Sequence, residues 1–227
     1  MGYNIAIDGP AGAGKSTIAK MAAKKLDFLY VDTGAMYRAM AYYFMINNID
    51  PEDQEKIAAS CPDIRIQLKY EEGTQQIYLN GENVSVQIRR EEVGNMASVI
   101  SAYPQVRGKL TSLQQEIAAE ENIIMDGRDI GTCVLPGAQL KIYLTASVHT
   151  RAQRRYKELT EKGTACSLEE IEKDIEERDY RDMHREISPL KAAPDAVVLD
   201  TSHMDIPQVI EKIMELAKKA GIAGKGL

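Results

Sequence analysis

The stretch Gly9-Pro10-Ala11-Gly12-Ala13-Gly14-Lys15-Ser16, close to the start of the chain, matches the pattern G-x-x-x-x-G-K-[ST]. A short apolar run, Asn4 to Asp8, precedes it, and an Ala-, Lys- and Met-rich segment, Lys15 to Leu26, follows. A buried strand, a glycine-rich turn and a helix are the context in which this pattern forms a phosphate-binding loop. Glycines let backbone N–H groups converge on an anion, and the helix start adds the positive end of its dipole.

The polar residues of this loop have expected roles toward a nucleoside triphosphate and its magnesium ion. We expect Lys15 to place a positive charge on the β- and γ-phosphates and Ser16 to offer its hydroxyl to Mg²⁺. Asp126 ends a later apolar run that starts at Ile123, and it has two interpretations. It could order a magnesium-bound water, or it could cap a turn at the end of a strand.

Composition indicates an ordinary globular chain with an acidic balance. The 227 residues include 28 Lys and Arg against 34 Asp and Glu, a net charge of −6. This balance argues against a general nucleic-acid binder, and no apolar run approaches the roughly 20 residues of a membrane span. The N-terminus does not resemble a signal peptide. Cys61, Cys133 and Cys166 are scattered, so they predict reduced thiols in a cytoplasmic protein rather than a zinc site or disulfides.

Strand and helix patterns alternate along most of the chain, which favours a parallel sheet with helices on both faces. We therefore expect an α/β fold, the three-layer α/β/α architecture of a P-loop NTPase. Besides the first strand and helix, we expect strands at 28–32, 123–126, 140–144 and 196–199 and helices at 35–47, 148–162, 168–185 and 206–220, with helical periodicity also at 93–100 and 106–117.

A different pattern occupies the segment from Asp63 to about Ile88, where apolar and polar residues alternate in three short runs. Gly73 and the pair Asn80-Gly81 separate the runs, and Asn-Gly is a strong hairpin signal. The segment predicts a small antiparallel β-meander, whose third strand would contain Val84, Val86 and Ile88, inserted between α/β units.

Arginines are numerous for an acidic chain, which suggests a clamp for a second anion beside the triphosphate. Arg178, Asp182 and Arg185 are spaced i, i+4 and i+7, on one helical face, although a solvated salt-bridged face would show the same spacing. The phosphate-binding loop alone does not separate a kinase from a GTPase switch or an ATP-driven motor. The guanine-reading motif N-K-x-D is missing, and the chain is small for a motor.

Four motifs, in order along nearly the whole chain, resemble those of the bacterial cytidylate kinases. They are Gly9 to Thr17, Asp32-Thr33-Gly34-Ala35-Met36-Tyr37-Arg38, Met125-Asp126-Gly127-Arg128-Asp129-Ile130-Gly131-Thr132, and the run from Glu177-Arg178-Asp179 to Arg185-Glu186-Ile187-Ser188-Pro189-Leu190. The resemblance implies transfer of the γ-phosphoryl group of ATP to CMP or dCMP, with Mg²⁺. It also implies a single domain over 1–227, with a core of 1–33, 108–150 and 190–227, a monophosphate-binding region of 34–107 that holds the meander, and a short lid with arginine helices over 151–189.

The resemblance assigns roles residue by residue. It implies that Arg38, Arg128 and Arg178 clamp the CMP phosphate and that Thr33, where the family often has Ser, lies near the phosphate or sugar. Residues implied for the remaining contacts are Gly9, Pro10, Ala11, Gly12, Ala13, Gly14, Lys15, Ser16 and Thr17 for the ATP phosphates, Ser98, Arg107 and Asp129 for cytosine, Asp182 and Arg185 for the ribose and phosphate, and Arg151, Arg154 and Arg155 for the lid, with Lys15, Arg128, Arg154 and Arg178 as the catalytic set.

The chemistry of such a reaction agrees with these residue types. The acceptor is a phosphate oxygen that is already anionic near neutral pH, so no strong general base is required. Arg forks and Mg²⁺ would offset the repulsion between two polyanions. A carboxylate such as Asp129 could accept from the cytosine N4 amine, while Arg107 and Ser98 could donate to N3 and O2.

Two alternatives remain open. The acceptor could be UMP, AMP or a small alcohol such as shikimate, although an alcohol would call for a base and would not need several arginines. The chain could also be a nucleotide-dependent switch or binding module without turnover. We expect a cytoplasmic monomer that acts on small molecules, with no nucleic-acid or membrane partner.

Overall fold

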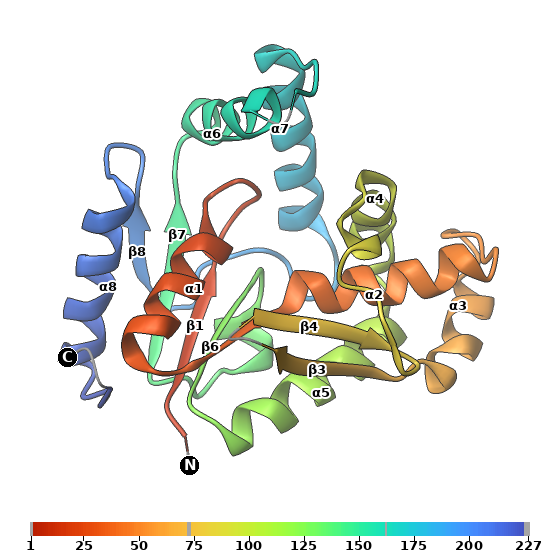
Figure 1. The fold of residues 1–227 in the computed structure, drawn as a ribbon, viewed down its shortest axis with the longest axis horizontal. Helices are drawn as coiled ribbons and strands as arrows, with labels where there is room; N and C mark the ends of the chain where they lie inside the picture. Colours follow the sequence, from red (N-terminus) through yellow and green to blue (C-terminus); the bar gives the residue numbers. More distant parts are fainter. Residues whose placement is uncertain (1, 72–73, 162, 225–227) are drawn as a thin grey trace. The chain divides into compact units, whose positions relative to one another are not determined.

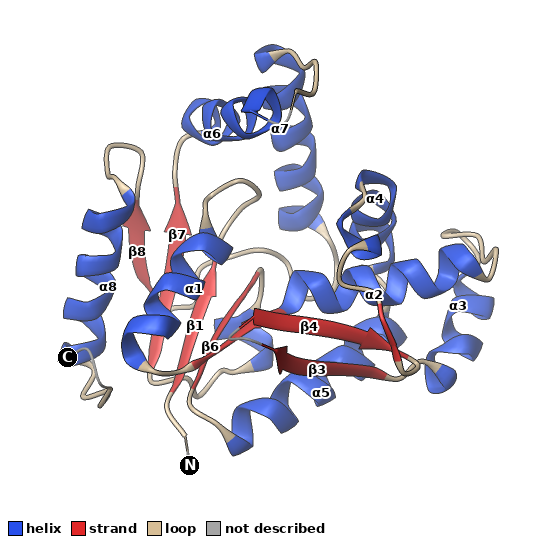
Figure 2. Ribbon diagram, in the orientation of Figure 1, coloured by secondary structure: helices blue, strands red, loops and turns tan. Residues whose placement is uncertain are grey.

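The computed structural model describes residues 2–71, 74–161 and 163–224, in which two sheets and their helices are defined (Figure 1). The larger sheet has the strand order β2-β6-β1-β7-β8. Figure 2 labels four of these strands, β6, β1, β7 and β8. Strand β1 pairs in parallel with β6 and with β7, and β7 pairs in parallel with β8. The strands are β1 (Asn4–Asp8), β2 (Leu29–Asp32), β6 (Ile123–Gly127), β7 (Leu140–Thr145) and β8 (Val197–Asp200). The expected α/β fold with a parallel central sheet is confirmed.

The chain divides into two compact units, one of residues Met1–Tyr30 and Ala118–Leu227 and the other of Val31–Ile117. The first unit contains most of the large sheet. Its helical elements are α1 (Lys15–Leu26), the π-helix η3 (Ile130–Val134), α6 (Val148–Glu161), α7 (Leu168–His184) and α8 (Ile206–Lys219). Lys162, the expected last residue of the α6 helix, lies outside the described residues.

The hydrophobic core of the first unit lies between the sheet and two helices, α1 and α8 (Figure 2). Ile5, Ile7 and Ile142 of the strands pack there with residues of both helices, and these three side chains are at most 1% exposed. Helix α8 begins with a capping box in which the Asp205 carboxylate accepts from the Gln208 N–H and the Gln208 side chain accepts from the Asp205 N–H. This packing fixes the carboxyl ends of β1, β6 and β7, where ligands bind in α/β proteins.

The second unit combines helices with the small antiparallel sheet. Its helical elements are α2 (Thr33–Ile46), α3 (Gln54–Ser60), the 3₁₀ helices η1 (Cys61–Asp63) and η2 (Gln87–Arg89), α4 (Glu91–Ile100) and α5 (Pro104–Glu120), whose last turn belongs to the first unit. The small sheet has the order β3-β4-β5, formed by β3 (Ile66–Glu71), β4 (Thr74–Leu79) and β5 (Glu82–Asn83). Helix α3 is not foreseen from the sequence patterns.

The expected third strand of the meander is wrong beyond Asn83. Strand β5 has only two residues, and Gln87–Arg89 form the 3₁₀ helix η2 instead. The backbone N–H of Ile77 donates to the Ser85 hydroxyl at 2.8 Å, so this side chain accepts from a strand edge that a longer β5 would pair with. Val86 is then 82% exposed while Ile88 is buried. The expected turn at Asn80-Gly81 is present, and Gly73 lies outside the described residues.

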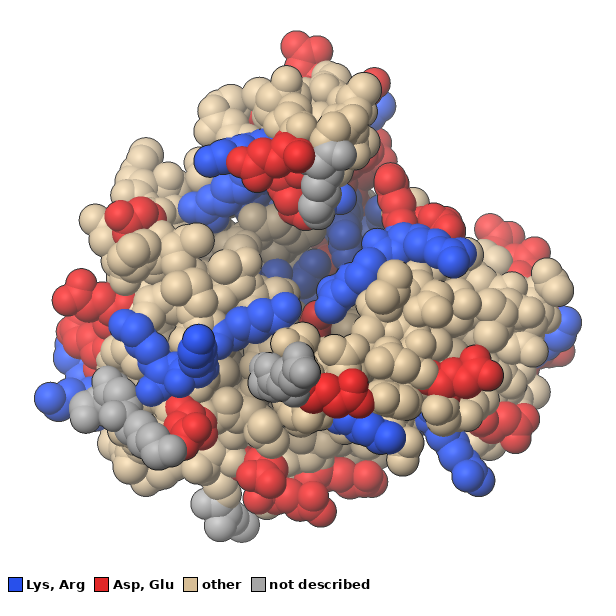
Figure 3. Space-filling view, viewed as in Figure 1, with Lys and Arg blue, Asp and Glu red and all other residues tan. Residues whose placement is uncertain are grey.

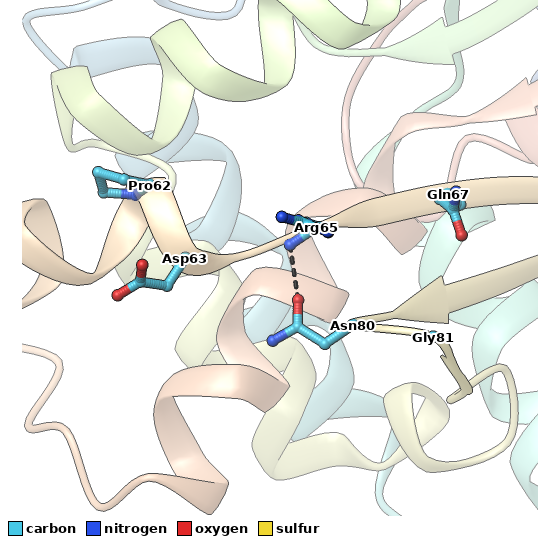
Figure 4. A pocket seen from close by; sticks show the side chains of 6 residues that line it. All are labelled: Pro62, Asp63, Arg65, Gln67, Asn80 and Gly81. Carbon is cyan, nitrogen blue, oxygen red and sulfur yellow. Dashed lines mark hydrogen bonds between the residues drawn. The ribbon is translucent and has the colours of Figure 1, made fainter.

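No helix in the described part of the chain is long and apolar enough to span a membrane. Acidic and basic side chains are both present on the face drawn in Figure 3. A surface pocket of the second unit is lined by polar side chains and the turn after β4, and within it the Arg65 N–H donates to Asn80 Oδ1 at 2.7 Å (Figure 4). None of its lining residues is among those expected to bind nucleotide. They are Pro62, Asp63, Arg65, Gln67, Asn80 and Gly81.

Candidate active site

The loop between β1 and α1 has the backbone conformation that its glycines allow. Gly9 has φ +151°, and a Cβ there would collide with the carbonyl oxygen of Leu144 on β7. Gly12 has φ +72° and lies against Arg151 of α6, so a side chain there would be both strained and crowded. The loop therefore runs directly over the end of the sheet and leads into the N-terminus of α1.

Lys15, at the start of α1, is buried near other charged groups. Its Nζ donates to the carbonyl oxygen of Pro10 at 2.7 Å, across the loop. Burial lowers the pKa of Lys15 well below its usual range, and the positive charges of Arg128 and Arg178 lower it further, against the opposing effect of Asp126. An anion arriving in the loop would oppose this repulsion, because it would add a negative charge beside Lys15.

A hydrogen-bonded group joins Ser16, Asp126 and Tyr30. The Ser16 hydroxyl donates to Asp126 Oδ2 at 2.9 Å, and the Tyr30 hydroxyl donates to Asp126 Oδ1 at 2.7 Å. Asp126 is 4% exposed at the end of β6. Hydroxyl and carboxylate oxygens are donors that Mg²⁺ prefers, so the residues present fit a magnesium ion. No sequence pattern points to Tyr30 as part of this group.

Arginines and carboxylates form a second group in the same unit. Arg128 Nε donates to Asp182 Oδ2 at 2.8 Å, and Arg185 Nη2 lies 3.6 Å from Asp129 Oδ1. Burial alone would raise the pKa of Asp182, but Arg128, Arg178 and Arg185 lower it below the usual range. The expected face of α7 thus carries a partly buried ion-pair group rather than a solvated charge run, with Arg185 just beyond the helix end.

Asp8, the last residue of β1, is a further buried carboxylate that the sequence patterns do not point to. The N–H of Ile130 donates to its Oδ1 at 2.8 Å, and the N–H of Gly131 donates to its Oδ2 at 2.7 Å. Burial raises the pKa of Asp8 to about 6, in spite of these two backbone hydrogen bonds, and the nearby Asp129 charge contributes to the rise. Asp8 therefore connects β1 to the segment that follows Arg128 and Asp129.

The raised pKa of Asp8 predicts a specific pH dependence of stability. The folded state binds this proton more tightly than the unfolded state, so Asp8 favours folding at low pH and loses that contribution as the pH rises toward about 6. At about 1.4 kcal/mol per pH unit, the unfolding free energy of the wild type relative to Asp8→Asn should fall by about 2 kcal/mol between pH 4.5 and 7.5. Urea unfolding followed by circular dichroism measures it, since the chain has no tryptophan. Parallel stability profiles for the two proteins would contradict the prediction.

Helices α6 and α7 pack on each other and on the phosphate-binding loop. Arg151 Nη1 lies 2.6 Å from Asp179 Oδ2 and donates to the Ala11 carbonyl oxygen at 2.8 Å. The Ala11 N–H in turn donates to Asp179 Oδ1 at 3.1 Å. Both charged side chains are under 10% exposed, so this pair binds the helices to the loop. Arg154 is held differently, since its Nη2 donates to the Thr201 carbonyl oxygen at 2.8 Å.

The second unit carries the other expected monophosphate contacts on three helices. Thr33 and Arg38 lie on α2, whose start is capped by the Asp32 carboxylate accepting from the Ala35 N–H. Ser98 lies on α4, which packs against α2. Arg107 of α5 is buried, and its Nη1 donates to the Ser101 carbonyl oxygen at 3.0 Å. Within this unit the four residues thus come from neighbouring elements.

Comparison with known proteins relates the sequence to one family. The family model described as cytidylate kinase matches residues 5–219. The chain is 50% identical over 215 residues to a cytidylate kinase of Lactobacillus johnsonii, with 95% of this chain and 94% of that protein covered. It is 53% identical over 215 residues to a cytidylate kinase of Listeria monocytogenes, with 94% and 95% covered.

Among solved structures, the fold is similar to that of an uncharacterised protein from Eubacterium ventriosum. The TM-score is 0.53 at 11% sequence identity, and the match covers 94% of this chain and 96% of the other. At this identity the likeness concerns the fold alone.

Proposed function

The chain belongs to the cytidylate kinase family, and from this premise we propose how its residues catalyse the transfer of the γ-phosphoryl group of ATP to CMP or dCMP. The products are CDP or dCDP and ADP. The observation that carries the proposal is the convergence, in one unit, of a phosphate-binding loop with the group of Arg128, Asp129, Asp182 and Arg185. A loop of this kind binds the phosphates of the donor ATP. A second cationic group can bind a second anion, the phosphate of CMP.

On the donor side, we propose that the backbone of Gly9 to Thr17 holds the phosphates of ATP and that Lys15 contacts the β- and γ-phosphates. Ser16, with Asp126 acting through water, would hold Mg²⁺. The bound ion would neutralise charge on the β- and γ-phosphate oxygens. Arg154 would reach the phosphates from α6, whereas Arg151 is bound to Asp179 and is expected to shape the loop.

On the acceptor side, we propose that Arg128 and Arg178 bind the CMP phosphate, with the Arg128 guanidinium oriented by the Asp182 carboxylate. Asp129 would accept from the cytosine amine, and Asp182 and Arg185 would contact the sugar and its phosphate. We also propose that Arg38 contacts the CMP phosphate, Thr33 the phosphate or sugar, and Ser98 and Arg107 the base.

Catalysis follows from position and charge rather than from a proton transfer. The attacking phosphate oxygen is anionic near neutral pH, so the site needs no general base. Its cations bring the two polyanions together, so that the attacking oxygen lies in line with the bond that breaks. They also stabilise the negative charge on the transferred phosphoryl group. We also propose that residues 1–33, 108–150 and 190–227 form the core, residues 34–107 the monophosphate-binding region and residues 151–189 the lid with its arginine helices. We further propose that the protein acts as a monomer in the cytoplasm.

A panel of acceptors tests the proposal directly. With ATP and Mg²⁺, a coupled assay of ADP release should give the highest kcat/KM for CMP and dCMP, and lower values for UMP, AMP and GMP. Product identification by chromatography should show CDP or dCDP. Preferential phosphorylation of a purine monophosphate, or ADP release at the same rate without any acceptor, would overturn it.

A further inference from the structure

The segment that follows Arg128 and Asp129 is a single π-helical turn, η3, and its N-cap position is Asp129 itself. An Asp at that position normally accepts from the N–H groups of its own helix start. Among the described contacts of η3, however, the Asp129 side chain makes no capping hydrogen bond. Its carboxylate instead lies 3.6 Å from the Arg185 guanidinium.

The cap of η3 comes from another strand. Both oxygens of Asp8, on β1, accept from the first two N–H groups of the turn, those of Ile130 and Gly131, at 2.8 and 2.7 Å. Asp8 is 4% exposed, and its sequence separation from these donors is more than 120 residues. The buried carboxylate thus satisfies the donors that would otherwise attract Asp129.

The fit between Asp8 and the turn is close. A Cβ on Gly131 would lie 3.3 Å from Asp8 Oδ2 and 3.2 Å from Cδ of Lys141, whose side chain passes over the glycine from β7. Lys141 Nζ donates to both oxygens of Asp195, so its charge is paired with that carboxylate. The turn is therefore held on one side by hydrogen bonds and on the other by packing.

We propose that Asp8 is a positioning residue for base recognition: by capping η3 in place of Asp129, it keeps the Asp129 carboxylate directed toward Arg185, in the position from which it would accept from the amine of the pyrimidine. This inference rests on the proposed function, since it concerns the residue that reads cytosine there. Asp8 itself would touch neither nucleotide, but it would help the site to select a base with an amine, as in CMP, over one with a carbonyl, as in UMP.

Asp8→Asn tests the inference, because the amide keeps the shape of the carboxylate but has one acceptor and places an NH₂ group against the other N–H. At pH 7.5 we expect the ratio of kcat/KM for CMP to that for UMP to fall about tenfold, because Asp129 then competes to cap its own helix. The KM for ATP should change less than about twofold. A control, Ile213→Val in the core of α8, lowers stability without contacting the turn and should leave the ratio unchanged.

A second variant protects the test against a folding defect of Asp8→Asn. Gly131→Ala introduces a Cβ against Asp8 Oδ2 and should lower the CMP-to-UMP ratio in the same direction, by about threefold. A wild-type ratio retained in both variants would overturn the inference, and so would an equal loss toward ATP and CMP. A wild-type enzyme that shows no preference for CMP would instead contradict the proposed function, so the two failures are distinguishable.

Discussion

Replacing Lys15 by methionine is expected to lower kcat on the order of 10³-fold, at saturating ATP and CMP. Lys15 is the residue whose charge meets the β- and γ-phosphates in the proposed mechanism, where negative charge is redistributed during transfer. Methionine fills similar space, so the loss comes from the charge rather than from a cavity. In steady-state kinetics, kcat should fall more than the KM values rise, because this interaction strengthens in the transition state.

The stability of this variant makes the result specific. Lys15 is buried, and burial together with Arg128 and Arg178 disfavours its charged form. Removing an unfavourably buried charge favours the folded state, whereas losing the hydrogen bond to Pro10 disfavours it. The unfolding free energy should therefore stay unchanged or rise. The control is Lys24→Met, an exposed lysine in the last turn of α1, which should retain wild-type kcat. A large loss of both activity and stability in the Lys15 variant would contradict this account.

The first part of the fold is predictable because its causes are local. The run Asn4 to Asp8, the glycines and the helix 15–26 lie within one short stretch, and the structure confirms each of them. Glycines at positive φ, a buried apolar strand and a helix start are all visible from neighbouring residues. The alternation of strands and helices further along predicts the parallel sheet for the same reason.

The parts that sequence patterns missed depend on distant partners. Asp8 looks like the last residue of a strand, and only the sheet brings it to Ile130 and Gly131. Tyr30 likewise reads as an ordinary strand residue until β2 and β6 place its hydroxyl on Asp126. The shortened β5 has the same origin, because alternation predicts a strand but the Ser85 hydroxyl accepts from the strand edge beside it.

The opposite pKa shifts of two carboxylates in the site also follow from the tertiary structure. Asp182 and Asp8 are both buried, yet the pKa of Asp182 is lowered and that of Asp8 is raised. The guanidinium groups of Arg128, Arg178 and Arg185 outweigh the effect of burial on the pKa of Asp182. At Asp8 burial dominates in spite of the two backbone hydrogen bonds, and the Asp129 charge adds to the rise. One carboxylate therefore serves as a permanent negative charge that orients arginines, and the other is a cap whose ionisation is costly.

Asp129→Ala should lower kcat/KM for CMP on the order of 10³-fold and change the KM for ATP by less than about threefold. The variant loses a charge-assisted hydrogen bond to the cytosine amine in the proposed site. It also leaves the nearly buried Arg185 guanidinium without the carboxylate that lies 3.6 Å away. UMP carries a carbonyl where CMP has the amine, so kcat/KM for UMP should fall far less, and the preference for CMP should almost disappear.

A control variant and a third nucleotide distinguish a loss of base recognition in Asp129→Ala from general damage to the site. The matched control is Asp174→Ala, which removes an exposed carboxylate of α7. It should leave kcat/KM for CMP and the KM for ATP unchanged. An equal loss of kcat/KM toward CMP, UMP and ATP would show that Asp129 supports the fold of the site. A loss confined to the cytidine nucleotides would instead leave base recognition as its role, because only they present an amine to the carboxylate.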